Sequence, residues 1–403
     1  MSPGAPNEMT NHRALAGRAA VAVTGAIALL AGTAMTAAPA AAGTGERLRH
    51  DVREIERLGV TGVVAEVRTP DGRFTARAGV ADRRTGRPAQ PGDHFRAASV
   101  TKTYVATVVL QLVGEGRLSL DDTVDEWLPG LVRGNGNDGR RITIRHLLQH
   151  TSGLHDYLSE IPLQRSAEDY REHRFDRYTP DRLVALALKH EPGFQPGETN
   201  PDGTPKWSYS NTGYALLGMI IEKASGKDWR VQVRDRVIRP LRLHGTHTPG
   251  HRATLPRPFL RGYRQYEEGA PPTDVTLLDP SVAGASGGMI TTVSDDNRFF
   301  RALIGGRLVP RVLLAEMQRT VPTGWDGAYQ GSRYGLGLFW FPLRCDRAGY
   351  WAHGGDMLGH MVREGVRADG GRSVSVAMST QLTGGGGERL NTAAAEAVEN
   401  ALC

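Results

Sequence analysis

Strand-like segments lie at both ends of this 403-residue chain, and a long block without a clear strand pattern separates them. The expected strands are Thr61–Val67, Phe74–Val80, Tyr334–Phe341, Gly349–His353, His360–Arg367 and Ser373–Ser379. Turn residues at 69–72 join the first two strands. The economical architecture is one antiparallel sheet that both chain ends build together.

Proline-broken helices are expected between about residues 118 and 250, where alternating patterns are scarce. Helices are expected at Arg47–Leu58, Ile144–Gln149, Asp181–Lys189, Gly213–Ser225, Ser294–Leu303 and Leu390–Leu402, with Asp181 as a cap after Pro180. The predicted fold class is therefore α+β: an antiparallel sheet flanked by N- and C-terminal helices, with an inserted all-helical subdomain. A pocket between the two lobes is the expected site.

The first 42 residues have the layout of a secretory signal peptide. Arg13 and Arg18 precede the apolar stretch Ala19–Leu30, and small residues at 40–43 favour cleavage after Ala42. The apolar stretch is too short and alanine-rich for a permanent membrane span. The expected product is a secreted domain of residues 43–403 with no stable membrane span after cleavage.

Charge and cysteine content restrict the partners of this exported domain. Removing the signal lowers the formal net charge from +6 to +5, and the surplus is spread without a lysine-rich run. Nucleic acid is therefore not an expected partner, whereas loose contact with an anionic cell envelope is compatible with the charge. Cys345 and Cys403 are the only cysteines and are expected to form one disulfide; two buried free thiols are the alternative.

A serine and a lysine stand three residues apart at the start of an apolar helix expected over Thr103–Glu115. Residues three apart share a helix face, so the Lys102 amine can reach the Ser99 hydroxyl. A buried lysine loses hydration, which lowers its pKa and lets it accept the serine proton. The simpler interpretation is that Ser99 is only a helix N-cap.

Two further motifs follow in the chain. Tyr209-Ser210-Asn211 lies in a polar loop of the helical block; Tyr209 could shuttle a proton at Ser99, and Asn211 could orient Lys102 and a substrate amide. In the simpler interpretation Asn211 caps the helix that begins at Gly213. His353-Gly354-Gly355 ends an expected strand, where two glycines let another backbone approach closely. No motif suggests a metal or another cofactor.

The order Ser-x-x-Lys, Tyr-x-Asn, His-x-Gly resembles the serine β-lactamase and D-alanyl-D-alanine carboxypeptidase superfamily, in its class C-like form. The segments Ile142–Leu154, Gly213–Gly218 and Ser286–Met289 carry the same resemblance, which extends over nearly all of the mature chain. The variant motifs look like those of class C β-lactamases and of the secreted D-alanyl-D-alanine carboxypeptidases of actinomycetes, together with their esterase and D-aminopeptidase relatives. The two cysteines also match the disulfide placement of the carboxypeptidase branch. The resemblance implies a β-lactamase/transpeptidase-like fold and a serine hydrolase that works through an acyl-enzyme.

The residue roles implied by the resemblance agree with the chemistry of the motifs. Ser99 is the expected nucleophile, and Lys102 and Tyr209 share the work of accepting its proton, with the true base left open. The backbone N–H groups of Ser99 and Asp356 are expected to form the oxyanion hole. Asn211, His353, Gly354 and Gly355 are expected to bind and orient the substrate.

Substrate class is less constrained by the sequence. The carboxypeptidases of this superfamily use threonine and arginine to bind a free carboxylate, but here Gly354, Asp356 and Phe339 stand at those positions. Asp356 would repel a carboxylate, and Arg363 is a candidate to restore the contact. Residues 339–341 are either core strand residues or the wall of an apolar pocket.

Three functions therefore follow from the sequence. The first is a D-alanyl-D-alanine carboxypeptidase acting on peptidoglycan peptides. The second is an esterase, an amidase or a class C-like β-lactamase of the same fold. The third is a non-catalytic penicillin-binding ectodomain. A small peptide, an ester or a β-lactam is the expected partner in each case.

Overall fold

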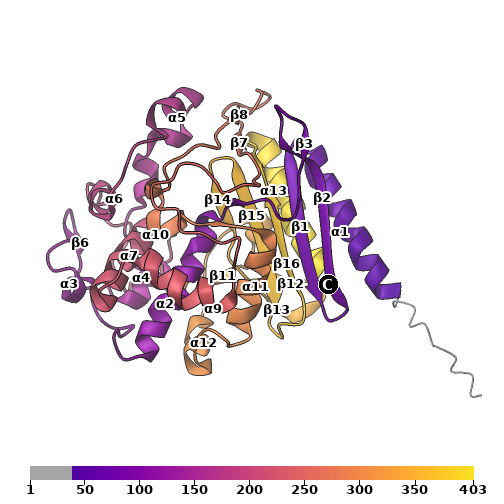
Figure 1. The fold of residues 1–403 in the computed structure, drawn as a ribbon. Coiled ribbons are helices and arrows are strands. Elements are labelled where there is room, and N and C mark those ends of the chain that lie inside the picture. Colours follow the sequence, from indigo (N-terminus) through magenta and orange to yellow (C-terminus); the bar gives the residue numbers. More distant parts are fainter. Residues whose placement is uncertain (1–38) are drawn as a thin grey trace, which may run out of the picture. The chain divides into compact units, whose positions relative to one another are not determined.

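The computed structural model describes residues 39–403, and it joins the two ends of the chain in one ten-stranded sheet (Figure 1). Across the sheet the order is β10 (Val321–Pro322), β11 (Arg333–Tyr334), β12 (Phe339–Leu343), β13 (Asp346–Ala352), β15 (His360–Arg367), β16 (Ser373–Met378), β1 (Gly62–Thr69), β2 (Gly72–Asp82) and β3 (Arg87–Pro88), with β14 (Gly355–Met357) also paired to β15. All pairs in this sheet are antiparallel, and β1 meets β16 with Val63 opposite Met378. The predicted sheet is confirmed.

Helices cover both faces of the sheet. The helices α1 (Pro39–Arg57) and α13 (Gly384–Leu402) pack on one face, and α11 (Val293–Ile304) packs on the other (Figure 1). Alternate residues of β1 explain this layering. Val63 and Ala65 join the core with α1 and α13, whereas Val64 joins the larger core with the remaining helices. The predicted signal peptide lies outside the described residues, except for its last four residues, which begin α1.

Between residues 118 and 250 most of the regular elements are helices, joined by long loops. This block contains α3 (Val124–Trp127), α4 (Ile144–Gln149), α5 (Ala167–His173), α6 (Pro180–Ala187), α7 (Asn211–Ser225), α8 (Trp229–Val233), α9 (Arg239–Leu241) and a short hairpin of β5 (Arg133–Gly134) and β6 (Asn137–Asp138). The prediction that Asp181 caps α6 is wrong. The hydroxyl of Thr179 caps α6 by accepting the Arg182 N–H, and Asp181 lies in the first turn.

Apart from α2 (Thr101–Gly114), the remaining elements are short. They are α10 (Gly284–Gly287), α12 (Arg311–Met317), β4 (Phe95–Arg96), β7 (Tyr263–Arg264), β8 (Thr273–Asp274), β9 (Ile290–Thr291) and β17 (Thr380–Gln381). The helix α2 carries the predicted nucleophile motif, and α10 packs against both α2 and α7. The three helices meet at the boundary between the helical block and the sheet.

The expected strand Tyr334–Phe341 is interrupted, and this corrects the sequence prediction. The chain leaves the sheet after Tyr334 and returns at Phe339. Between them Gly337 has a φ of +77°, and a Cβ there would lie 2.4 Å from the Cβ of Ala106 in α2. Its carbonyl accepts a 2.8 Å hydrogen bond from Thr103. Close approach to α2 therefore requires glycine at this position and breaks the strand.

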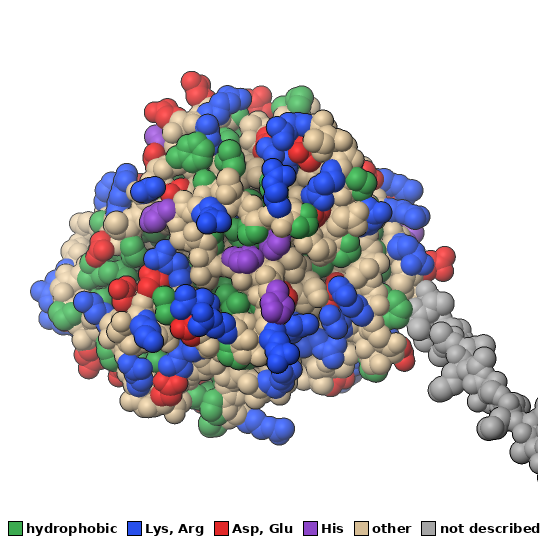
Figure 2. Space-filling model, in the orientation of Figure 1, with side chains coloured by type: hydrophobic (Ala, Val, Ile, Leu, Met, Phe, Trp, Pro, Cys, Tyr) green, Lys and Arg blue, Asp and Glu red, His purple; other side chains and the backbone are tan. Residues whose placement is uncertain are grey.

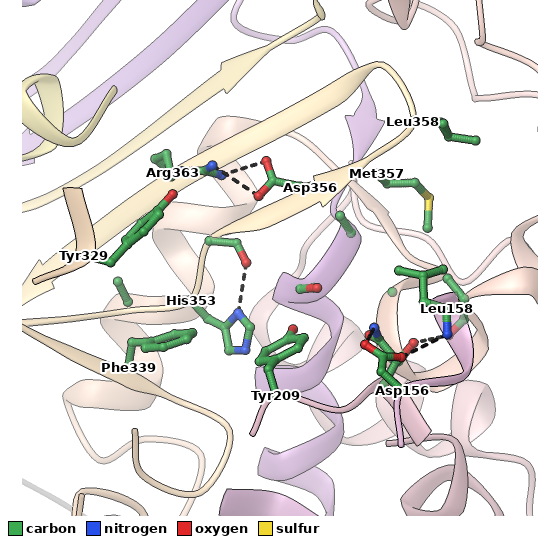
Figure 3. Close-up of a pocket in the computed structure, with 18 of the residues that line it drawn as sticks. Asp156, Leu158, Tyr209, Tyr329, Phe339, His353, Asp356, Met357, Leu358 and Arg363 are labelled. Carbon is green, nitrogen blue, oxygen red and sulfur yellow. Dashed lines mark hydrogen bonds and ion pairs between the residues drawn. The ribbon is translucent and has the colours of Figure 1, made fainter. Parts of the chain in front are cut away.

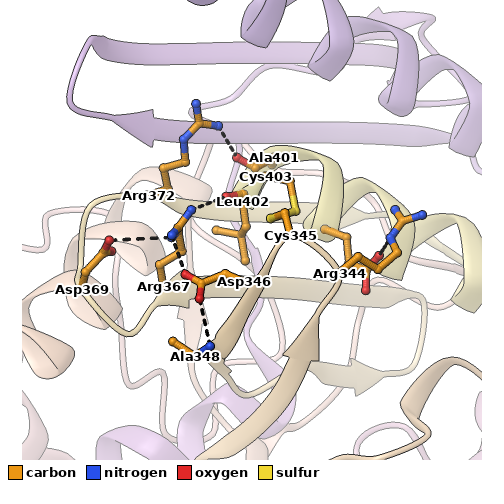
Figure 4. The surroundings of a disulfide bond; sticks show 11 residues. Arg344, Cys345, Asp346, Ala348, Arg367, Asp369, Arg372, Ala401, Leu402 and Cys403 are labelled. Carbon is orange, nitrogen blue, oxygen red and sulfur yellow. Dashed lines mark hydrogen bonds and ion pairs between the residues drawn. A yellow bond between two sulfur atoms is a disulfide. The ribbon is translucent and has the colours of Figure 1, made fainter.

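The expected disulfide is confirmed between Cys345, in the turn after β12, and Cys403, which follows α13 (Figure 4). It closes a segment with a sequence separation of 58 residues. Beside it Arg367 contacts Asp346 and donates to the Leu402 carbonyl at 3.5 Å. The bond thus holds the end of α13 to the strands that it covers.

Replacing Cys345 by serine is expected to lower the free energy of unfolding by about 2–4 kcal/mol. Without the disulfide the unfolded chain can adopt more conformations, and its higher entropy favours unfolding. Urea unfolding of the two proteins measures the difference. The matched variant Cys403→Ser should show the same loss, and the double variant should show no further loss. A change of less than about 0.5 kcal/mol would exclude a stabilising role for the disulfide.

Two further properties concern the surface. Within residues 39–403, no helix combines the length and the apolar character that crossing a membrane requires. On the face drawn in Figure 2, lysine and arginine side chains are scattered with acidic side chains among them. The expectations about nucleic acid, envelope contact and secretion stay predictions.

Candidate active site

Ser99 lies in a single 3-10 turn, Ala98–Val100, that leads directly into α2. The residue before it, Ala98, has a φ of +50°, in the left-handed region that residues with a Cβ rarely adopt. Such a conformation costs about 1–3 kcal/mol and is typical of functional sites. The simpler interpretation of Ser99 as an N-cap is wrong, because Val100 is the N-cap and no side chain caps α2. Ser99 remains partly exposed at the cavity wall.

Lys102 lies in the first turn of α2, and its side chain is fully buried. Its Nζ atom lies 3.2 Å from Ser99 Oγ, 2.7 Å from Asn211 Oδ1 and 2.8 Å from the carbonyl oxygen of Ser286 in α10. Burial disfavours the charged ammonium and lowers the pKa of Lys102 to about 7, although the negative charge of Asp156 acts in the opposite direction.

A pKa of about 7 makes the uncharged form of the Lys102 amine available near neutral pH, and that form has two N–H donors and one lone pair. The Asn211 Oδ1 atom and the Ser286 carbonyl can only accept hydrogen bonds, so each takes one N–H. The lone pair then faces Ser99 Oγ, the third neighbour. The arrangement can therefore take the hydroxyl proton of Ser99 as a general base.

Tyr209 stands on another side of the same hydroxyl. Its side chain is hydrogen-bonded to Ser99, and its ring centre lies 4.7 Å from Lys102 Nζ. Burial raises the pKa of Tyr209 well above its ordinary value, with the Ser99 hydrogen bond acting in the opposite direction. Tyr209 therefore keeps its proton at neutral pH and can donate it.

His150 fixes the backbone on both sides of Tyr209. Its carbonyl accepts the Ser208 N–H at 3.0 Å, and its Nδ1 accepts the Ser210 N–H at 3.2 Å. Its ring centre lies 4.3 Å from that of Tyr209. Burial lowers the pKa of His150 well below the ordinary value, which agrees with an Nδ1 atom that accepts a hydrogen bond. This residue, which ends α4, was not predicted as part of the site.

Asn211 begins α7, but its side chain does not cap the helix. The expected capping role is wrong, because the helix begins at Asn211 itself and Ser210 is the N-cap. Instead Oδ1 accepts from Lys102 at 2.7 Å, and Nδ2 donates to Asp156 Oδ2 at 2.8 Å. Asp156 thereby fixes the orientation of the amide. Asp156 was not predicted as a site residue; it lies two residues beyond the motif segment that ends at Leu154.

The third motif lies at the end of β13. His353 Nδ1 lies 2.9 Å from the Gly354 carbonyl, so Nδ1 carries the proton and Nε2 accepts from the Tyr334 hydroxyl at 2.9 Å. Burial lowers the pKa of His353 to about 3, so the ring is neutral in the physiological range. A Cβ at Gly355 would lie 2.4 Å from the Ala97 carbonyl. The expected close approach therefore takes place at Gly355, beside the Ser99 turn.

Asp356 and Arg363 form a bidentate ion pair at the cavity wall (Figure 3). Both Arg363 terminal nitrogens lie 3.1 Å from an Asp356 carboxylate oxygen, and one also donates to Asn391 Oδ1 at 2.9 Å. The negative charge of Asp356 contributes to raising the pKa of the buried Arg363. The guanidinium that could have bound a substrate carboxylate is thus already engaged.

The three motifs open onto a cavity of about 340 Å³. Its lining includes Ser99, Tyr209, Asn211, His353 and Gly354, and therefore brings together most of the predicted side chains. One wall is aromatic: Phe339 and Tyr329 lie beside His353 (Figure 3), and Trp325, Phe341 and Tyr350 also line it. Both alternatives for residues 339–341 hold in part, since Phe339 and Phe341 are buried and also line the cavity, whereas Trp340 does not.

Residues 46–399 match the protein-family model described as Beta-lactamase, and the chain belongs to this family. The family places it among serine hydrolases of the penicillin-binding protein, esterase and D-amino acid amidase type. The predicted family is therefore confirmed.

The similar proteins carry different names, which include amidohydrolase, amidase and penicillin-binding protein. The chain is similar to a D-stereospecific amidohydrolase from Streptomyces sp., with 41% identity, a TM-score of 0.75, and coverage of 83% of this chain and 94% of that one. D-amino acid amidase from Ochrobactrum anthropi SV3, complexed with L-phenylalanine amide, is 25% identical with a TM-score of 0.75 over 89% and 98% of the two chains. Penicillin-binding protein 4 of Amycolatopsis lactamdurans is 33% identical over 59% of this chain and 58% of its own length, so this chain spans just over half of that relative.

Proposed function

We propose that this protein is a serine amidohydrolase that cleaves amides of D-amino acids with an apolar or aromatic side chain, through an acyl-enzyme on Ser99. The observation that carries the proposal is the buried Lys102 amine, held by two acceptors and facing Ser99 at 3.2 Å. A complete set of Ser99, Lys102 and Tyr209 in mutual contact, with Ser99 and Tyr209 at one cavity, also argues against a non-catalytic ectodomain.

In the proposed acylation step, Ser99 Oγ attacks the substrate carbonyl carbon while its proton passes to Lys102 Nζ. The oxyanion accepts hydrogen bonds from the backbone N–H groups of Ser99 and Asp356. Tyr209 then donates its hydroxyl proton to the leaving nitrogen and recovers one from Lys102. The C–N bond breaks, and the amine leaves with its proton.

In the proposed deacylation step, water attacks the ester carbonyl and gives up a proton to the Lys102–Tyr209 pair. The ester bond to Ser99 Oγ breaks, Ser99 regains its proton, and the acid product leaves. Lys102 is the proposed base, because burial makes its uncharged form available near neutral pH, whereas burial keeps Tyr209 protonated.

Three observations support the amide of an apolar D-amino acid, rather than a C-terminal peptide, as substrate. The aromatic cavity wall suits an apolar side chain. Arg363 is engaged by Asp356 and Asn391, and so offers no free charge to a substrate carboxylate. The similarity to the Streptomyces amidohydrolase supports the D configuration. D-alanyl-D-alanine carboxypeptidase activity is the second candidate, favoured by the position of Arg363 at the cavity wall and by the penicillin-binding relative.

The proposal is tested by initial rates on D-phenylalanine amide, L-phenylalanine amide, a D-Ala-D-Ala peptide and a short-chain ester. The expected result is a kcat/KM for the D-amide at least about tenfold above that for the L-amide and for the peptide, which corresponds to about 1.4 kcal/mol of discrimination. Cleavage of the peptide in preference to the D-amide would support the carboxypeptidase instead. Cleavage of the ester alone would make the protein an esterase.

The rate is also expected to depend on pH through Lys102. Below its pKa of about 7 the lysine is an ammonium group without a lone pair, so kcat/KM should fall about tenfold for each pH unit. Above pH 7 the uncharged amine predominates and the rate should reach a plateau. A pH profile from 5 to 9 measures this, with the exposed Lys223→Met variant as the control. A rate that stays constant from pH 5 to 9 would contradict Lys102 as the base.

A further inference from the structure

Two histidines and a glutamate come together outside the catalytic groups. His155 and Glu160 lie at the two ends of the segment that contains the 3-10 turn Tyr157–Glu160, and His190 follows α6. His190 Nε2 lies 3.0 Å from Glu160 Oε1, and His155 Nε2 lies 3.9 Å from the same oxygen. The two imidazole rings are stacked with centres 4.0 Å apart.

The spacing of these atoms resembles that of ligands around a small divalent cation. Nitrogen and oxygen ligands at 2.0–2.1 Å from a tetrahedral metal lie about 3.3 Å from one another. The two nitrogen–oxygen separations, 3.0 and 3.9 Å, fall on both sides of that value, and all three ligand atoms lie within 4.8 Å of one another. Two neutral imidazoles and one carboxylate are a ligand set that suits Zn²⁺ and leaves a fourth position for water.

The surroundings hold the ligands and leave a path from solvent. The His155 carbonyl accepts the Thr212 hydroxyl at 2.6 Å, and the His190 carbonyl accepts the Asn137 side-chain N–H at 2.9 Å. The side chains of all three ligands are 28–42% exposed, so an ion can enter without local unfolding. The Ser159 hydroxyl, 2.9 Å from His155 Nε2, would have to turn away, and the Asp156 carbonyl at 2.9 Å already offers it another partner.

We propose that His155, Glu160 and His190 form a binding site for Zn²⁺ or a similar divalent transition metal. The ion would join the end of α6 to the loop that carries Asp156, the partner of Asn211. It would therefore hold the loop at the edge of the catalytic cavity, away from the reacting atoms. Without a metal, the same residues would form only a hydrogen-bonded surface cluster.

The test is calorimetric titration of the protein, purified without a histidine tag and treated with a chelator, with ZnCl₂ at pH 7.5. We expect one Zn²⁺ per chain with a Kd of about 10 µM or tighter, and a rise in Tm with zinc concentration, because an ion that binds the folded state stabilises it. Glu160→Gln, which keeps the side-chain volume, and His190→Ala should each weaken binding at least about tenfold.

His173→Ala is the matched control, because His173 lies on the same block in a 2.9 Å contact with Asp176 and should leave zinc binding unchanged. Melting of each variant in EDTA shows that it is folded. Wild-type binding weaker than about 10 µM, or binding that survives both Glu160→Gln and His190→Ala, would overturn the proposal and leave a hydrogen-bonded cluster.

Discussion

Replacement of Ser99 by alanine is expected to lower kcat/KM for every cleaved substrate by about 10⁴-fold or more, because the acyl-enzyme cannot form without the Oγ atom. The variant should still fold, since no side-chain cap of α2 depends on Ser99. Initial rates on D-phenylalanine amide measure the loss, with Ser225→Ala at the surface end of α7 as the control.

We expect any residual turnover in the Ser99→Ala variant to be small, because it must proceed without an acyl-enzyme. If the variant instead retained a tenth or more of the wild-type rate, the hydrolysis would use another nucleophile. Catalysis at Ser99 would then not explain the positive φ of Ala98 or the burial of Lys102.

The second large effect is expected for Lys102→Met, which keeps the length of the side chain and removes the amine. We expect kcat/KM to fall by about 10³-fold or more, because both the general base and the proton supply to Tyr209 are lost. The substitution also leaves Asn211 Oδ1 and the Ser286 carbonyl without a donor, which costs about 1–3 kcal/mol for each buried group. Rates must therefore be measured at a temperature where circular dichroism shows the variant fully folded.

The control for this variant is Lys223→Met, an exposed lysine near the end of α7. It should leave the rate unchanged. A Lys102→Met enzyme within tenfold of wild type, together with a Tyr209→Phe enzyme that is inactive, would transfer the role of base to Tyr209.

The sheet and its flanking helices could be predicted because local patterns decide them. The bounds of β15, His360–Arg367, and of α4, Ile144–Gln149, are those expected from the local sequence. The break between Tyr334 and Phe339 could not be predicted. It depends on the approach of Gly337 to α2, which is more than 200 residues away in the sequence.

In the candidate site, too, residues in local motifs could be predicted, whereas residues placed by distant contacts could not. Ser99, Lys102, Tyr209 and His353 belong to short motifs. The structure places Ser99, Tyr209 and His353 at one cavity, and the buried Lys102 contacts Ser99 from below the cavity wall. Asp156, by contrast, carries no local signal: its contact with Asn211 spans 55 residues of sequence.

Some side-chain roles depend on contacts that no spacing rule reveals. Asn211 was given a capping alternative because residues of its type often begin helices, but the nearby amine and carboxylate determine its orientation instead. Arg363 was a candidate partner for a substrate carboxylate, and its pairing with Asp356 appears only when β14 and β15 are paired. The contacts of these two side chains thus depend on the folded structure rather than on motif spacing.

The central claim is that Ser99 forms a covalent acyl-enzyme. Intact-mass spectrometry of the protein treated with a fluorescent penicillin or a fluorophosphonate, followed by peptide mapping, tests it directly. We predict one adduct per chain, located on the peptide that contains Ser99 and absent from the Ser99→Ala variant. An adduct that persists in Ser99→Ala, or a protein that hydrolyses its substrate yet takes no label from either reagent, would contradict it.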